Sequence, residues 1–417
     1  MAKPKRHQIQ KPTSITSLNS SKRPDSSKPS GMYSSISISN FRSFEQLELH
    51  NLARINLFFG PNNSGKTSIL EAVYAHACGR NFGPFLRQVT LGRQGGSLSG
   101  ILDFGEKLKT LFRNTSTLPY TFSISASIVD ESKPHTLRST FWPSSDLADL
   151  DPRVMGQFPP GEISAKTIKT SNNATNRISD QTVESISPSV FLGKWETEID
   201  KRVLSFELRL PLSDQLVASP FKLGVMEDIL AHRGAGGDMR VFSHLKRYRV
   251  LAEFTKEMKR AFPEVHEIDA VPYPDGTQSP VYVITTSGQQ MPLYAFGDGM
   301  RRWYYLLGQM VAYRNSVQCI EEIDATLHPA ACRSLSPLIV EYARKFDNQL
   351  FLTSHSIEFA DAFLEALYGE NGAATFDDDP VRVFTIKPSN NLGRPEIWSL
   401  TGREAYEKRR DFELELR

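Results

Sequence analysis

The sequence is poor in cysteine and contains no long apolar run. Only three cysteines occur among 417 residues, Cys78, Cys319 and Cys332, and none has His or Cys neighbours at metal-ligand spacing. We expect them to be reduced and structural, which excludes a disulfide framework and a zinc site. No stretch could span a bilayer, and the N-terminus lacks the apolar segment of a signal peptide, so we expect a cytoplasmic protein without a membrane partner. The net charge of +2 is nearly balanced and does not itself predict a nucleic-acid partner.

The most specific motif is a phosphate-binding loop of the form G-x-x-x-x-G-K-[ST]. Residues 54–59 fit a buried strand that enters the loop and residues 68–73 a helix that leaves it, which disfavours a chance match. The glycines let backbone N–H groups point at phosphate oxygens, and the helix N-terminus adds its positive dipole end. Lys66 would neutralise the β- and γ-phosphates of ATP, and the Thr67 hydroxyl would hold Mg²⁺. The expected nucleotide contacts are Gly60, Pro61, Asn62, Asn63, Ser64, Gly65, Lys66, Thr67 and Ser68.

Hydrolysis also needs a metal anchor, a group that orients water and a contact to the γ-phosphate. The apolar strand at 317–320 ends in Glu321, which we expect to take Mg²⁺, and Glu322, which we expect to orient the attacking water. His355 follows the next buried strand, 349–353, and is placed to contact the γ-phosphate. The alternatives are an ordinary polar strand end and a satisfied turn histidine. Because the two acids and the histidine follow strands of consecutive β-α units in a P-loop protein, the catalytic interpretation is favoured.

Hydrophobic patterning predicts alternating strands and helices around these motifs. The expected strands are an edge hairpin at 36–49, strands at 118–129 and 203–210, a hairpin at 281–293, and strands at 381–387 and 396–400. The expected helices are 221–262, broken at 234–237, then 300–313, one opened by Pro329, and 357–367. Residues 146–188 are polar and fit a loop. Basic residues between 233 and 260 could contact a phosphate backbone, although charged helix faces are usually only solvated.

Together these motifs resemble the ABC-type ATPases of the SMC and RecF group, and most closely the bacterial AAA-type ATPases related to the OLD family. The resemblance covers roughly residues 32–75 and 280–400 and is carried by residues 40–44, 60–67, 296–302, 321–329 and 353–356. It implies an α/β P-loop fold of the ABC-ATPase head type with an inserted helical arm. In that family Glu321 and Glu322 would end the Walker B strand, residues 325–328 would form the D-loop, and His355 would be the switch histidine. It also implies a nucleotide contact for Arg42.

The resemblance further assigns Gly297, Asp298 and Gly299 to the signature segment, which in related ATPases completes the nucleotide site of a second subunit. It therefore implies a homodimer or higher oligomer with ATP held between two chains. Arg302 is a candidate for phosphate contact in trans, and the alternative for Arg301 and Arg302 is a surface pair. No residue fixes the glutamine loop, and Glu321 stands where most of the superfamily has Asp, so hydrolysis could be slow.

This assignment divides the chain into four regions: a disordered basic tail at 1–31, an ATPase lobe with Walker A at 32–110, inserted strands, loop and helical arm at 111–280, and a second ATPase lobe at 281–417. We expect no Toprim nuclease domain of the OLD type after Leu400. The first expected function is therefore an ATPase switch that controls a separate effector, a nuclease or toxin, in anti-phage defence. The alternatives are a DNA repair ATPase that binds DNA through residues 233–260, and a nucleotide-held scaffold with little turnover.

Overall fold

The computed structural model describes most of the chain, and the residues that it describes form three sheets. The described residues are 31–79, 82–91, 107–143, 190–210, 222–229, 231–233, 236–270, 280–369, 379–387 and 393–412. The predicted tail, apart from Gly31, and the polar segment at 146–188 lie outside the described residues. Within the described ranges, no helix is both long and apolar enough to cross a membrane.

The first sheet is antiparallel and has the strand order β2-β1-β4-β5-β6-β7. The edge hairpin and the strands predicted at 118–129 and 203–210 are confirmed, whereas β5 and β6 were not predicted. Strands from the region assigned as an insertion thus extend the sheet that β1 and β2 begin. The bounds are β1 Tyr33–Phe41, β2 Phe44–Leu49, β4 Tyr120–Ile128, β5 His135–Pro143, β6 Val190–Ile199 and β7 Arg202–Leu210.

The second sheet has the order β15-β14-β3-β13-β12-β8 and is parallel except for β15. The bounds are β3 Ile55–Phe59, β8 Leu223–Glu227, β12 Ser316–Ile320, β13 Gln349–Thr353, β14 Val381–Lys387 and β15 Glu396–Thr401. Because parallel strands bring their carboxyl ends to one edge, the residues after β3, β12 and β13 lie close together.

Strand β8 corrects the prediction of helix from residue 221. Leu223 to Glu227 pair with β12 and extend the buried sheet. A Cβ added at Gly224 would lie 2.9 Å from the Ala77 Cβ, so the strand packs directly against the helix that follows the P-loop. Pairing and close packing at this position outweigh local helix propensity.

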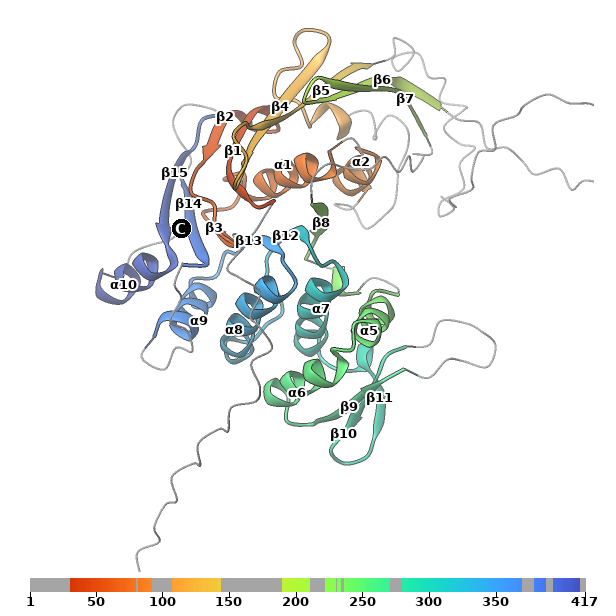
Figure 1. Ribbon diagram of the computed structural model, residues 1–417, viewed down its shortest axis with the longest axis vertical. Helices are drawn as coiled ribbons and strands as arrows, with labels where there is room; N and C mark the ends of the chain where they lie inside the picture. Colours follow the sequence, from red (N-terminus) through yellow and green to blue (C-terminus); the bar gives the residue numbers. More distant parts are fainter. Residues whose placement is uncertain are drawn as a thin grey trace, which may run out of the picture.

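Helices cover both faces of the second sheet (Figure 1). Helix α1 (Lys66–Cys78) lies between the two six-stranded sheets, and α2 (Phe82–Leu91) packs beside it. Helices α7 (Asp298–Ala312), α8 (Pro329–Lys345) and α9 (Ile357–Tyr368) cover the opposite face, and α10 (Gly402–Phe412) packs on α9. The helices predicted from 300, 329 and 357 are confirmed, and α10 was not predicted. All three cysteines are buried and unbridged, as expected.

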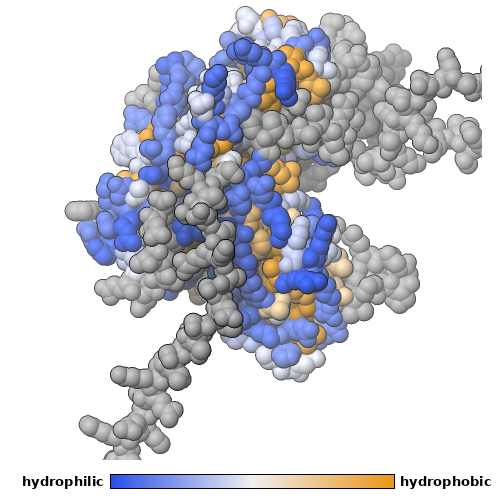
Figure 2. All heavy atoms as spheres, viewed as in Figure 1, coloured by the Kyte–Doolittle hydropathy of each residue, from blue (hydrophilic) through white to orange (hydrophobic). Residues whose placement is uncertain are grey.

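The predicted helical arm packs against α7. It consists of η3 (Ala231–Arg233), α5 (Gly237–Arg247) and α6 (Leu251–Ala261), followed by a small sheet. That sheet contains β9 (Val265–Asp269) and the predicted hairpin, β10 (Tyr282–Thr285) and β11 (Gln290–Pro292), which leads into η4 (Leu293–Ala295). The face shown in Figure 2 is mostly hydrophilic, with hydrophobic residues in smaller separate areas.

Candidate active site

The loop between β3 and α1 has the backbone geometry that a phosphate cradle requires. Gly60 and Gly65 have φ angles of 150° and 94°, and Asn63 has a φ of 62°. A Cβ added at Gly65 would lie 2.5 Å from the Phe44 ring, so the loop rests directly on β2. The first turn of α1 follows, and its N–H groups and dipole favour an anion.

Lys66 is buried beneath this loop, with 5% of its surface exposed. Its Nζ donates to the carbonyl oxygens of Gly60 at 2.7 Å and Pro61 at 2.9 Å, and lies 3.4 Å from His355 Nδ1. Burial lowers the pKa of Lys66 to about 8, although Glu322 and Glu321 act in the opposite direction. Phosphate oxygens would be better partners for this desolvated ammonium group than two neutral carbonyls.

Thr67 and Glu321 meet where the sequence places the metal. The Thr67 hydroxyl donates a hydrogen bond to Glu321 Oε1, and the Glu321 N–H donates to the carbonyl of Glu227 at the end of β8, at 2.9 Å. A hydroxyl and a carboxylate are hard oxygen donors that suit Mg²⁺. Among the described residues no cluster of three His, Cys, Asp or Glu could hold a metal alone. Mg²⁺ is commonly bound by one or two protein oxygens together with phosphate and water, so Thr67 and Glu321 would be sufficient protein ligands.

Glu322 and His355 form the exposed side of the same site. His355 Nε2 lies 3.7 Å from Glu322 Oε1, and both side chains are about 40% exposed. Glu322 has a φ of 44°, unusual for a residue with a side chain, and its N–H donates to Thr353 Oγ1 at 2.9 Å. Such backbone strain concentrates at functional sites. The structure therefore brings together Lys66, Thr67, Glu321, Glu322 and His355, the residues predicted for catalysis and metal binding.

The predicted signature segment lies beside the predicted D-loop of the same chain. A Cβ added at Gly299 would lie 3.1 Å from the Thr326 carbonyl oxygen, whereas one at Gly297 would contact nothing within 4 Å. Helix α7 begins at Asp298, two residues earlier than predicted, and Asp298 is paired with Arg233. Completion of a second chain's site by Gly297, Asp298 and Gly299 stays a prediction.

Arg302 corrects a prediction. Its side chain is fully buried, and its two terminal nitrogens donate to four backbone carbonyls, those of Asp228, Ile229, Glu321 and Glu322, at 3.2–3.3 Å. A guanidinium held inside its own chain cannot reach a phosphate in trans, and neither is it half of a surface pair. The sequence does not distinguish the buried role of Arg302 from a phosphate contact in trans, because an arginine after a signature segment fits both.

Two further arginines are used within the chain. Arg42 donates to both carboxylate oxygens of the buried Glu71 in α1, at 2.8 and 3.0 Å. This guanidinium ties β1 to α1, and the nucleotide contact expected of Arg42 stays a prediction. Arg301 Nε donates to Asp238 Oδ2 at 3.1 Å, and both side chains are largely buried. Sequence reasoning missed Glu71 and Asp238, since neither belongs to a motif.

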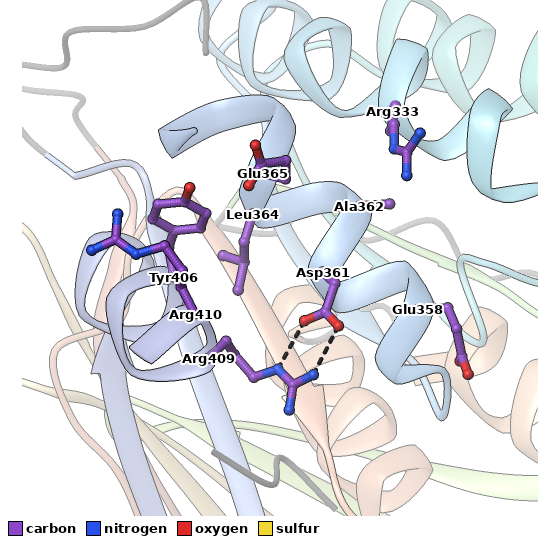
Figure 3. Close-up of a pocket in the computed structure, with 9 residues that line it drawn as sticks. All are labelled: Arg333, Glu358, Asp361, Ala362, Leu364, Glu365, Tyr406, Arg409 and Arg410. Carbon is purple, nitrogen blue, oxygen red and sulfur yellow. Dashed lines mark hydrogen bonds and ion pairs between the residues drawn. The ribbon is translucent and has the colours of Figure 1, made fainter. Parts of the chain in front are cut away.

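A groove of about 480 Å³ lies elsewhere, between α8, α9 and α10. Figure 3 shows Arg409 of α10 pairing with Asp361 of α9, at 2.8 Å for each of two contacts. None of the residues predicted for nucleotide or metal binding lines this groove. It therefore has no part in the predicted chemistry.

A glycine-rich loop ahead of α1, two acids after β12 and a histidine after β13 define a P-loop ATPase. Residues 55–361 match the family described as "AAA domain, putative AbiEii toxin, Type IV TA system", and residues 32–76 match the "AAA ATPase domain" family. The first match spans well over half of the sequence, so the chain belongs to that family and is an ATPase.

Individual relatives agree with this class. A Helicobacter pylori protein named "ATP/GTP phosphatase" is 22% identical over 347 residues, which cover 79% of this chain and 86% of that protein. The "DNA replication and repair protein RecF" of Nitrosococcus oceani is 47% identical over only 47 residues, or 11% of this chain and 13% of RecF. A crystal structure of an SMC head bound to the C-winged helix domain of ScpA is similar with a TM-score of 0.50 and 12% identity, over 89% of this chain and 99% of that one. That likeness confirms the predicted ABC-ATPase head fold.

Proposed function

We propose that this chain is a switch ATPase in which two copies close around Mg²⁺-ATP and the ATP-bound dimer controls a separate effector protein. The observation that carries the proposal is the convergence of Lys66, His355 and Glu322 within contacts of 3.4 and 3.7 Å, next to Thr67 bonded to Glu321. Each of these residues lies just after a strand of the second sheet or at the start of helix α1. The backbone of the fold therefore sets their relative positions.

Each residue has a distinct task. The N–H groups of the loop and the ammonium group of Lys66 bind the phosphate oxygens. Thr67 and Glu321 would hold Mg²⁺, which when bound neutralises charge on the phosphates. The Glu322 carboxylate accepts a hydrogen bond from the attacking water and orients it, and the His355 imidazole contacts the γ-phosphate.

The family description names a putative AbiEii toxin of a Type IV toxin–antitoxin system, which supports a role in such a system. The separate nuclease or toxin effector and the anti-phage role are our proposal. The RecF similarity supports the alternative, a repair ATPase that binds DNA directly. Two basic residues of the 233–260 region already have acidic partners: Lys246 pairs with Asp269 and Arg260 with Glu257. This reduces the positive charge available to a phosphate backbone and favours the effector hypothesis.

Two substitutions test the proposal. Lys66→Ala should abolish ATP binding in calorimetry, because the phosphates lose their buried countercharge. Glu322→Gln should retain binding but lose phosphate release by about 100-fold, and it should accumulate an ATP-bound dimer in light scattering. A Glu322→Gln chain with normal turnover, or one that stays monomeric with ATP and Mg²⁺, would refute the switch. The scaffold alternative instead predicts an ATP-held oligomer whose effector response is unchanged by Glu322→Gln.

A further inference from the structure

We propose that Arg233 contacts the γ-phosphate of a nucleotide bound to a second copy of this chain, and that Asp298 holds Arg233 in position. The inference rests on the proposed dimeric function and adds a residue that no sequence motif assigns. Arg233 lies in η3, ahead of α5, and not in the P-loop, the signature segment or the strand ends.

The Arg233–Asp298 pair lies at the surface of the signature segment. A terminal nitrogen of Arg233 donates to Asp298 Oδ2, and the two side chains are 50% and 37% exposed. Asp298 opens the 15-residue helix α7, between Gly297 and Gly299. Because a side chain at Gly297 would meet no atom within 4 Å, the surface beside the pair is open.

The charges explain why the pair is needed. An unpaired carboxylate at a helix N-terminus would repel a triphosphate brought to that terminus. The guanidinium of Arg233 cancels this charge, and it also holds the pKa of Asp298 below its usual range. A guanidinium has five N–H donors in a planar fork, so it can bind one carboxylate and still donate to a phosphate.

His232 lies next to the same carboxylate, on its buried side. Its side chain is fully buried, and its Nε2 lies 3.8 Å from Asp298 Oδ1. Neither ring nitrogen has a hydrogen-bond partner within the described part of the chain. A buried polar group without a partner is costly and needs a reason. The unpartnered imidazole of His232 is close enough to Asp298 to hydrogen-bond after a small shift of the carboxylate, whose exposed side Arg233 already holds.

Arg302 fixes this unit relative to the hydrolysis machinery. Its terminal nitrogens bridge the carbonyls of Asp228 and Ile229, just before η3, and those of Glu321 and Glu322. Gly299 in turn packs on Thr326 of the predicted D-loop. Residues 228, 229 and 231–233, the start of α7 and residues 321–326 are therefore linked to one another, and a second copy would bring its phosphate loop to the exposed Arg233–Asp298 pair.

Mixing two inactive chains tests the proposal. Lys66→Ala removes the phosphate contact within the chain, and Arg233→Ala removes the proposed contact in trans. If Arg233 acts in trans, a mixed dimer keeps one intact site, with Lys66 from the Arg233→Ala chain and Arg233 from the Lys66→Ala chain. An equimolar mixture should then recover about a quarter of the wild-type rate, because random assortment places half the chains in mixed dimers with one intact site each. If Arg233 acts in cis, every site is defective and the mixture stays inactive, which would overturn the proposal.

The controls separate the remaining explanations. Arg260→Ala removes another exposed arginine paired with an acid, Glu257, and should retain wild-type turnover. If Arg233 served only to neutralise Asp298, the double variant Arg233→Ala, Asp298→Asn would regain activity, and that result would overturn the proposal. Arg233→Gln serves in the mixture if circular dichroism shows that Arg233→Ala does not fold.

Loss of double-stranded DNA binding by Arg233→Ala with turnover unchanged would assign Arg233 to nucleic acid instead. If the wild type neither hydrolyses ATP nor dimerises, the proposed function itself is refuted. If the wild type is active but the mixture does not recover activity, only the role of Arg233 in trans is refuted.

Discussion

Replacing Arg302 with Met should both destabilise the protein and slow hydrolysis. Methionine fills a similar volume but donates no hydrogen bond, so four backbone carbonyls in the protein interior would lose their donor. The substitution would also remove a cation near the buried carboxyl of Glu227. Burial already raises the pKa of Glu227 to about 7, against the effects of Tyr305, Arg240 and Arg302.

The magnitude follows from these contacts. The four hydrogen bonds are long, at 3.2–3.3 Å, and share two nitrogens, so they count as about two good bonds. Unpaired buried acceptors cost about 1–3 kcal/mol each, and breaking a buried charge network costs about 3–5 kcal/mol. We therefore expect a loss of about 3–5 kcal/mol. Turnover should fall about 10- to 100-fold, because the carbonyls of Glu321 and Glu322 would no longer be held and small displacements of catalytic groups are costly.

Urea unfolding followed by circular dichroism and a phosphate-release assay would measure both effects. The unfolding midpoint should fall by about 1 M or more. Arg301→Met is the matched control on the same helix: it breaks one contact, with Asp238, and should shift the midpoint less. A wild-type midpoint for Arg302→Met would refute the reasoning. A second outcome would also refute it: an Arg302→Met chain that is stable but inactive and regains activity when mixed with a Lys66→Ala chain. That is the behaviour of a residue acting in trans.

Two further predictions concern the phosphate loop and the first sheet. Gly65→Ala should abolish ATP binding and destabilise the protein by about 1–3 kcal/mol, because φ is 94° at this position and the new Cβ would overlap the Phe44 ring; wild-type affinity in calorimetry would contradict the described loop. Burial lowers the pKa of His135, but its hydrogen bonds to Glu131 at 2.5 Å and Asp200 at 2.6 Å outweigh this and raise it overall. Since the folded pKa exceeds the unfolded value of about 6.5, this stabilisation is complete below that pH and is lost as pH rises through the folded pKa. The free energy of unfolding measured with urea should therefore decline across this window, by no more than about 1 kcal/mol, and His135→Gln should remove the decline. An identical pH dependence in the variant would show that other groups cause it.

Motifs with local chemical constraints could be predicted from the sequence, and roles set by three-dimensional packing could not. The glycines of the loop, the acids after β12 and His355 each follow a recognisable strand, so their convergence follows from parallel topology. Strand β8 was mistaken for helix because its pairing with β12 joins residues about 90 positions apart, which local periodicity does not reveal. The contacts that Arg42 and Arg302 make within the chain could not be predicted for a similar reason. Their acceptors are Glu71 and four backbone carbonyls, which the sequence does not place beside them.

The contacts of Arg302 also explain how nucleotide bound at one surface could affect hydrolysis at another. Helix α7 carries Asp298 at its exposed start and Arg302 about one turn further on, inside the protein. Any displacement of α7 when a second copy closes on Asp298 and Arg233 would act through Arg302 on the carbonyls of Glu321 and Glu322. Glu322 has a strained backbone, with a φ of 44°, so a small change in its support can move its carboxylate relative to the attacking water. If two copies close as proposed, hydrolysis would depend on dimer closure, because the residue proposed to orient water is held by the helix that the second copy would contact.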